Sequence, residues 1–215
     1  MKKNLITSAL AVIAFTVVLG LAYPLAMTGI AQVAFPNRAD GSPITVNGKV
    51  VGSRLLAQAY QVPVLDASGK PKKDAKGNPV TAPDPKYFQP RPSQTGYNAN
   101  GTFFSNRGPN QAGAKFFYRD QLKAYLDLEG PYNPGLKSAG VPEDAVTTSG
   151  SGVDPHISRA NAAIQSRRIA AVRKLPLARV LQLVSRNTDG RSLGFLGEPG
   201  VNVTELNLAL DREAR

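Results

Sequence analysis

The sequence has 215 residues, enough for one domain of ordinary size together with a membrane anchor or a tail. Lysine and arginine outnumber the acidic residues by 26 to 15, and the formal charge of +11 favours anionic partners without choosing among them. The sequence contains no cysteine, which excludes disulfides, cysteine-ligated zinc, iron–sulfur clusters and thiol nucleophiles. His156 is the single histidine, so we assign no metal ligands.

The N-terminal region is one long apolar segment. No charged residue occurs between Lys3 and Arg38, and residues 5–35 exceed the about 20 apolar residues that span a bilayer. A cleaved signal peptide is the alternative, with a small-x-small site at 20–22, although the apolar run continues well past it. Because two lysines precede the segment, the positive-inside rule predicts a cytoplasmic N-terminus and a domain outside the cytoplasm.

The composition along the chain predicts three parts. Residues 1–35 are the cytoplasmic N-terminus and transmembrane anchor, residues 36–50 are a polar linker, and residues 51–215 are a soluble domain. The anchor is expected to contact membrane lipid and to pack on partner helices through its small residues. The fold class predicted for the whole chain is α+β, with a single N-terminal transmembrane helix followed by one mixed α/β extracytoplasmic domain.

The first half of the domain is predicted from its turns and from one amphipathic stretch. Residues 66–86 are hydrophilic and rich in Gly, Pro and Lys, which predicts a hairpin or surface loop. Apolar side chains within 116–128 recur at helical spacing.

Two helices are predicted in the C-terminal half, and one further segment is ambiguous. Asp154-Pro155 predicts a helix start, with Ser158 as a rival cap. A second helix is predicted from Pro176 onwards. Residues 201–210 alternate in two registers, which favours a bulged strand over a helix capped at Asn202.

The sequence carries few signs of catalytic chemistry. It contains neither a P-loop nor an HExxH motif. Ser149-Gly150-Ser151-Gly152, before the predicted helix, is a weak candidate for an anion-binding nest. Ser151, Asp154 and His156 are the three residue types of a catalytic triad, but they lie within six residues, so capping roles are favoured.

The C-terminal helices are strongly basic. They bear seven Lys and Arg residues between 167 and 191 against one acid, Asp189. Because no aromatic interleaving or reading motif accompanies these charges, nucleic acid is not predicted as a partner. Three interpretations of these charges remain. They form a surface that docks on an acidic protein, a surface that docks on lipid headgroups, or a solvated face without a partner.

Several motifs in order resemble the C subunit (KdpC) family of the bacterial potassium-transporting ATPase. Residues 141–158, VPEDAVTTSGSGVDPHIS, resemble the family pattern VPxDxVTxSGSGLDPHIS almost position for position. Residues 190–199, GRSLGFLGEP, are a second match, and the helix between them fits Q-x-x-R-[VI]-A-x-x-R from Gln165. The chain departs from the family at Arg159, usually proline, and at Gly200, often arginine.

The resemblance implies a non-catalytic accessory subunit of a high-affinity, ATP-driven potassium uptake pump in the bacterial inner membrane. Its implied partners are a channel-like subunit that carries K+, a catalytic P-type ATPase subunit and a small fourth subunit. It also implies that the chain stabilises the complex and promotes ATP binding by the catalytic subunit. The chain itself would need no cofactor and have no catalytic residue.

The resemblance also implies candidate nucleotide contacts. These are Ser149, Gly150, Ser151 and Gly152 with Gln165 behind them, and Arg168 as a neutralising cation. A buried structural pair is the competing interpretation for Arg168, because it falls within an apolar stripe. ATP is cytoplasmic, whereas the lysines predict an external domain, which conflicts with direct contact. The alternative function is a membrane-anchored extracytoplasmic hydrolase or anion-binding domain.

Overall fold

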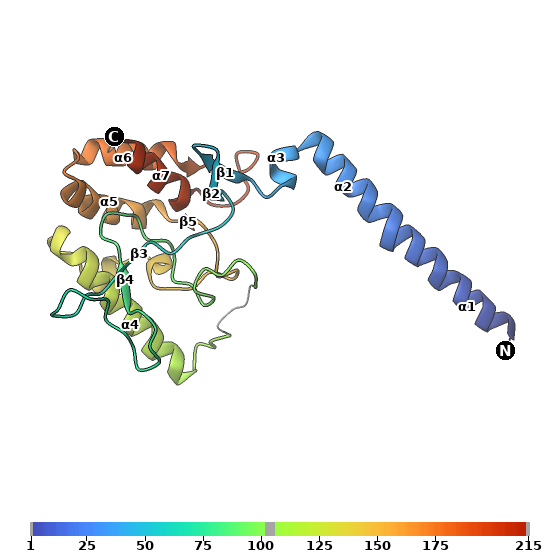
Figure 1. The fold of residues 1–215 in the computed structure, drawn as a ribbon, viewed down its shortest axis with the longest axis horizontal. Coiled ribbons are helices and arrows are strands. Elements are labelled where there is room, and N and C mark those ends of the chain that lie inside the picture. The colour runs from blue at the N-terminus through green and yellow to red at the C-terminus, as the bar shows by residue number, and fades with distance from the viewer. Residues whose placement is uncertain (1, 102–105, 214–215) are drawn as a thin grey trace. The chain divides into compact units, whose positions relative to one another are not determined.

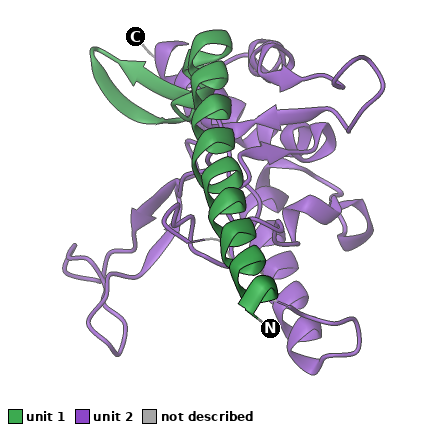
Figure 2. Cartoon of the chain, turned by 90° about the vertical axis from the view of Figure 1, so that its right-hand side faces the viewer, with its two compact units in different colours: residues 1–53 green, residues 54–215 purple. Residues whose placement is uncertain are grey.

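The structure is a computed structural model that describes residues 2–101 and 106–213 (Figure 1). The chain forms two compact units, residues 1–53 and residues 54–215, which Figure 2 colours separately. Each unit is described below by itself.

Unit 1 begins with a long helix. It consists of α1 (Lys2–Phe15), a π-helix η1 (Thr16–Ala22) and α2 (Tyr23–Ala34). The helix from Lys2 to Ala34 has 33 residues and is long and apolar enough to cross a membrane, and its apolar part is not buried within the chain. The predicted transmembrane helix is therefore present.

The π-helix is explained by Pro24. Proline has no N–H to donate, and its ring clashes with the carbonyl one turn back in an α-helix. The wider π-turn is in place just before it, where the N–H of Tyr23 donates to the carbonyl of Val18, five residues back. Thr28 Oγ1 donates to the Pro24 carbonyl at 2.8 Å. The helix thus continues through the proline with a local change of winding.

The segment expected to be a linker is folded. It contains α3 (Pro36–Ala39) and a hairpin of β1 (Pro43–Val46) and β2 (Lys49–Ser53). Asn47 and Gly48 join the strands with φ of 51° and 76°, the left-handed conformation required by a two-residue hairpin turn.

The core of unit 2 lies among three helices and a small sheet. α5 (Arg159–Arg173), α6 (Leu177–Arg186) and α7 (Val203–Glu213) pack together (Figure 1). The antiparallel sheet has the order β5-β7-β6, with β5 (His156–Ile157), β7 (Gly200–Asn202) and β6 (Thr188–Asp189). The buried apolar cluster includes Phe88, Ile157, Ile169, Val180, Val201, Leu206 and Leu210.

The predicted second helix is confirmed as α6, but the predicted start of the first helix at Asp154 is wrong. α5 begins at Arg159, and the rival cap Ser158 accepts a hydrogen bond from the N–H of Asn161 at 3.1 Å. The physical reason is that His156 and Ile157 pair with β7 as a strand. Burial of Ile157 at 2% exposure favours this extended conformation over a longer helix.

The predicted strand over 201–210 is also wrong beyond Asn202. α7 begins at Val203, and Asn202 Oδ1 accepts from the N–H of Glu205 at 3.1 Å, which is the capping geometry of the rejected helical interpretation. Helical spacing buries Val203, Leu206 and Leu210 completely, whereas a strand would place residues 203 and 206 on opposite faces.

The hydrophilic segment forms a hairpin, one of the two forms predicted for it. β3 (Gln61–Pro63) pairs with β4 (Thr81–Pro83), and two turns fill the loop between them. Asp66 and Asp74 each accept backbone N–H groups two and four residues later, in repeated D-A-x-G-x-P sequences.

The predicted helix over 116–128 is confirmed as the longer α4 (Ala112–Glu129). Three short 3₁₀ turns follow it: η2 (Gly130–Tyr132), η3 (Ser138–Gly140) and η4 (Glu143–Ala145). They lead the chain from α4 to the loop before β5.

Candidate functional site

Segment 84–89 begins with a turn, in which the N–H of Tyr87 donates to the carbonyl of Asp84, and passes between α5 and α7, whose side chains bind its backbone. Each of its six carbonyl groups accepts at least one side-chain hydrogen bond. Arg168 Nη1 donates to the carbonyls of Pro85 at 2.5 Å and Tyr87 at 3.0 Å, and Arg173 Nε donates to that of Lys86 at 2.7 Å. Asn207 Nδ2 donates to Phe88 at 2.9 Å, and Gln165 Nε2 donates to Gln89 at 3.0 Å. Gln89 Nε2 donates to Asp84 at 3.0 Å. Five of these six hydrogen bonds come from side chains of α5 and α7, so the two helices satisfy most of the carbonyl groups of the segment.

Two side-chain amides bind this segment in the same way. Asn207 accepts from the N–H of Phe88 and donates to its carbonyl, both at 2.9 Å. Gln165 accepts from the N–H of Gln89 at 2.7 Å and donates to its carbonyl at 3.0 Å. Each amide satisfies both backbone groups of one residue, so Phe88 can bury its ring fully in the core.

Arg168, a predicted site residue, is completely buried and pairs with Glu129, which is also completely buried. Its Nε lies 2.9 Å from Glu129 Oε1, and its other nitrogens donate to segment 84–89 and to Gln165 Oε1. Burial raises the pKa of Glu129, and the guanidinium of Arg168 opposes that rise. The competing interpretation of Arg168, a buried structural pair, is therefore the one its contacts support.

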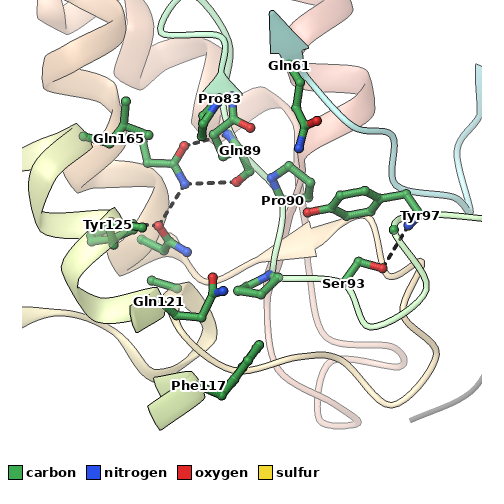
Figure 3. A pocket seen from close by; sticks show the side chains of 16 residues that line it. Gln61, Pro83, Gln89, Pro90, Ser93, Tyr97, Phe117, Gln121, Tyr125 and Gln165 are labelled. Carbon is green, nitrogen blue, oxygen red and sulfur yellow. Dashed lines mark hydrogen bonds between the residues drawn. The ribbon is translucent and has the colours of Figure 1, made fainter. Parts of the chain in front are cut away.

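A pocket of about 290 Å³ lies beside Gln165. Figure 3 shows Phe117, Gln121 and Tyr125 of α4 on one side, and Gln61, Pro90 and Tyr97 on the other. Among the described residues that line it, all are uncharged at neutral pH, and amides, prolines and aromatic rings predominate. Burial raises the pKa of Tyr97 to about 12, so its hydroxyl stays protonated. Such a lining suits an uncharged group better than a phosphate.

The predicted nest at Ser149, Gly150, Ser151 and Gly152 has another construction. The N–H of Gly152 donates to Ser149 Oγ at 2.9 Å, and the N–H of Val153 donates to Ser151 Oγ at 3.2 Å. These amides therefore point into the loop itself, and α5 begins only at residue 159. The helix N-terminus expected directly behind the loop is not there.

The loop is instead attached to the wall of the pocket. Ser93, which lines the pocket, donates to the carbonyl of Gly152 at 2.5 Å. Gly152 has φ +74°, and a Cβ there would come within 2.9 Å of Thr95, so glycine is required. The structure thus places Gln165 in the pocket wall, Arg168 behind it, and the loop one layer away through Ser93.

His156 belongs to a second cluster on the small sheet. Its Nδ1 lies 3.2 Å from Asp154 Oδ1, and its Nε2 lies 3.1 Å from Asp189 Oδ2. The imidazole passes over Gly200, where a Cβ would approach its atoms to 3.1–3.3 Å. The hydrogen bond that the imidazole donates to Asp154 is the largest cause that raises the pKa of His156, and burial opposes it. Both ring nitrogens therefore face carboxylates rather than Ser151, which argues against the alternative of a hydrolase.

Most of the seven Lys and Arg residues between 167 and 191 form ion pairs within the chain. Arg173 pairs with Asp211 at 2.9 Å, Arg179 with Glu213 at 2.6 Å, and Arg191 with Glu198 at 2.8 Å. Some of these basic side chains therefore join α5 and α6 to α7.

The comparison with known proteins identifies the family. The family model for the K+-transporting ATPase c chain, KdpC, matches residues 5–212. The chain belongs to the KdpC family. A Potassium-transporting ATPase KdpC subunit of Rhodospirillum rubrum is 46% identical over 200 residues, which cover 92% of this chain and 90% of the relative. The KdpC subunit of Koribacter versatilis is 42% identical over 213 residues, which cover 98% and 95%.

KdpC membership confirms the resemblance that the motifs at 141–158 and 190–199 predicted. Those motifs now have places in the structure. The first forms the loop before β5 and the strand itself, and the second forms most of the excursion between β6 and β7. Glu129 and Asn207, which complete the polar network, lie outside both motifs.

Replacing Arg168 by leucine tests the buried pair. Arg168→Leu leaves the Glu129 carboxyl buried without its cation and removes the hydrogen bonds that Arg168 donates to Pro85, Tyr87 and Gln165, so we expect a loss of about 3–5 kcal/mol in the free energy of unfolding. Chemical denaturation of the full chain in detergent measures it. The matched control is Arg168→Leu with Glu129→Leu, which should recover part of the loss. An Arg168→Leu chain as stable as wild type would contradict the assignment.

The pH dependence of stability tests the His156 cluster. Because the pKa of His156 is raised in the folded chain, its contribution is complete below the unfolded pKa of about 6.5 and is lost as the pH rises through the folded pKa. We expect the melting temperature of wild type to exceed that of His156→Gln by a margin that shrinks from about pH 5.5 to pH 9. The lowered pKa of Asp154 acts below this range. A margin constant with pH would contradict the charged imidazole.

Proposed function

We propose that the chain is a non-catalytic accessory subunit of a high-affinity, ATP-driven potassium uptake pump. The observation that carries this proposal is the match of residues 5–212 to the K+-transporting ATPase c chain. The relatives that match nearly the whole chain bear the name Potassium-transporting ATPase KdpC subunit. Its proposed partners are the channel-like subunit that carries K+, the catalytic P-type ATPase subunit and the small fourth subunit.

The proposed location is the bacterial inner membrane, crossed once. Helix Lys2–Ala34 is the anchor, and Lys2 and Lys3 favour a cytoplasmic N-terminus. Unit 2 then lies outside the cytoplasm, where we propose that it packs on the outer face of the channel-like subunit and stabilises the complex.

For ATP we propose an indirect role. ATP is cytoplasmic, so a domain outside promotes ATP binding by the catalytic subunit only through the partner subunits or the anchor. The contacts described above support this: Arg168 is paired with Glu129, and the amide of Gln165 is bound to Gln89. The N–H groups of Gly152 and Val153 donate to Ser149 and Ser151. These predicted nucleotide contacts are proposed instead to maintain the shape of the domain.

Labelling of single cysteines tests the topology, and the cysteine-free chain is well suited to it. In the assembled pump in intact cells, a membrane-impermeant maleimide should label Lys72→Cys, on the exposed hairpin. The matched control Lys2→Cys should react only after the inner membrane is permeabilised. The reverse pattern would place the domain in the cytoplasm. Co-purification in mild detergent should recover the pump subunits in equal proportion, and a chain that purifies alone would refute the proposed role.

A further inference from the structure

The excursion between β6 and β7 ends in a closed turn, residues 191–198, which we call the apolar turn. Its backbone is fixed by its own hydrogen bonds. Ser192 and Leu196 exchange two N–H···O bonds, each of 2.9 Å, and the N–H of Gly194 donates to the carbonyl of Arg191 at 3.1 Å. The base is closed by Arg191 Nη2, which lies 2.8 Å from both carboxylate oxygens of Glu198. The turn is therefore pre-organised.

This turn exposes the apolar side chains that a folded domain usually buries. Leu193 is 82% exposed, Phe195 68% and Leu196 50%. Leu193 also has φ +54°, a left-handed conformation that is strained for a leucine. Neither the exposed apolar side chains nor the positive φ of Leu193 stabilises the folded domain. Three exposed apolar groups on a fixed, strained turn are the arrangement expected of an interaction anchor.

The charges around the tip favour a protein partner over lipid. Arg191 and Glu198 cancel, so the turn has no net charge. The Glu198 side chain is 81% exposed beside the apolar tip. Segments that insert into anionic bilayers instead carry an excess of Lys and Arg. A small apolar centre with a paired, solvated ionic rim is the anatomy of a protein–protein contact.

The strands on both sides of the excursion are held together with the first residue of unit 2. Arg54 is the first residue of unit 2, and its guanidinium lies 2.5 Å from Asp189 Oδ1 and 3.2 Å from Glu205 Oε2. Asn202 Nδ2 donates to the Arg54 carbonyl at 2.9 Å. Arg54 therefore contacts both strands that flank the excursion: β6, which ends at Asp189, and β7, which begins at Gly200.

We propose that the apolar turn is the surface by which unit 2 docks on an apolar hollow in the outer face of the channel-like subunit. This proposal rests on the proposed function. Leu193, Phe195 and Leu196 enter the hollow, and the Arg191–Glu198 pair forms part of the rim. The strain at Leu193 holds its side chain at the tip, where it contributes contact area only in the assembled pump.

A variant that shortens the tip without weakening the domain tests the proposal. Leu193→Gly removes the apolar group and relieves the positive φ, and it is combined with Phe195→Ser. We expect the full-length double variant to bind the other pump subunits in detergent at least about tenfold more weakly than wild type, with an unchanged or higher melting temperature. The matched control is Leu65→Ser, which removes an apolar group of 58% exposure from the hairpin and should bind as wild type does.

The outcomes separate this proposal from the proposed function. Wild-type chain that fails to bind the pump subunits sinks the proposed function itself. Wild-type affinity in the double variant overturns only the docking surface. A polarity-sensitive dye on Phe195→Cys should shift to the blue when the partner subunits are added to nanodiscs. A shift already complete in nanodiscs that hold the chain alone would assign the turn to lipid and overturn the proposal.

Discussion

The buried ion pair of Arg168 and Glu129 organises unit 2. Both groups are removed from water, which is favourable only when their remaining hydrogen-bonding groups find partners. Arg168 meets this condition by donating to Pro85, Tyr87 and Gln165, whereas Glu129 Oε2 is buried without a hydrogen-bond partner among the described residues, which raises the cost of burying the pair. Arg168 therefore joins three parts of the chain: the end of α4, the middle of α5 and segment 84–89. Gln165 and Asn207 then extend the same network to Gln89 and Phe88.

This network accounts for the pocket. Gln89, the last residue of segment 84–89, lines the pocket, and Pro90 and Pro92 follow it in the pocket wall. Helix α4 supplies the facing aromatic side chains (Figure 3), and Arg168 holds its last residue, Glu129. Two of the side chains that the sequence suggested as nucleotide contacts, Gln165 and Arg168, therefore help to shape the pocket. In a subunit proposed to lie outside the cytoplasm, such a network gives a firm shape to the domain that contacts the pump.

The sequence predicted those parts of the fold in which side-chain periodicity dominates. The anchor, α4 and α6 follow from apolar spacing alone. The start of α5 and the state of 201–210 did not, because two capping residues competed at the first site and two periodicities at the second; burial of Ile157 and Leu206 decides them. The sequence pointed to Gln165 and Arg168 but not to the contacts that they make, nor to Glu129 and Asn207. Gln165 and Arg168 bind backbone groups some 80 positions earlier in the chain, and no local pattern reveals such a contact.

Amide hydrogen exchange of Phe88 and Gln89 in the full chain tests most directly whether these side chains hold segment 84–89. Both N–H groups donate to side-chain oxygens, so we expect them to exchange as slowly as the amides of α5. Asn207→Ala should speed exchange at Phe88 and Gln165→Ala at Gln89. Exchange in wild type as fast as at Ala67, on the exposed hairpin, would contradict the account.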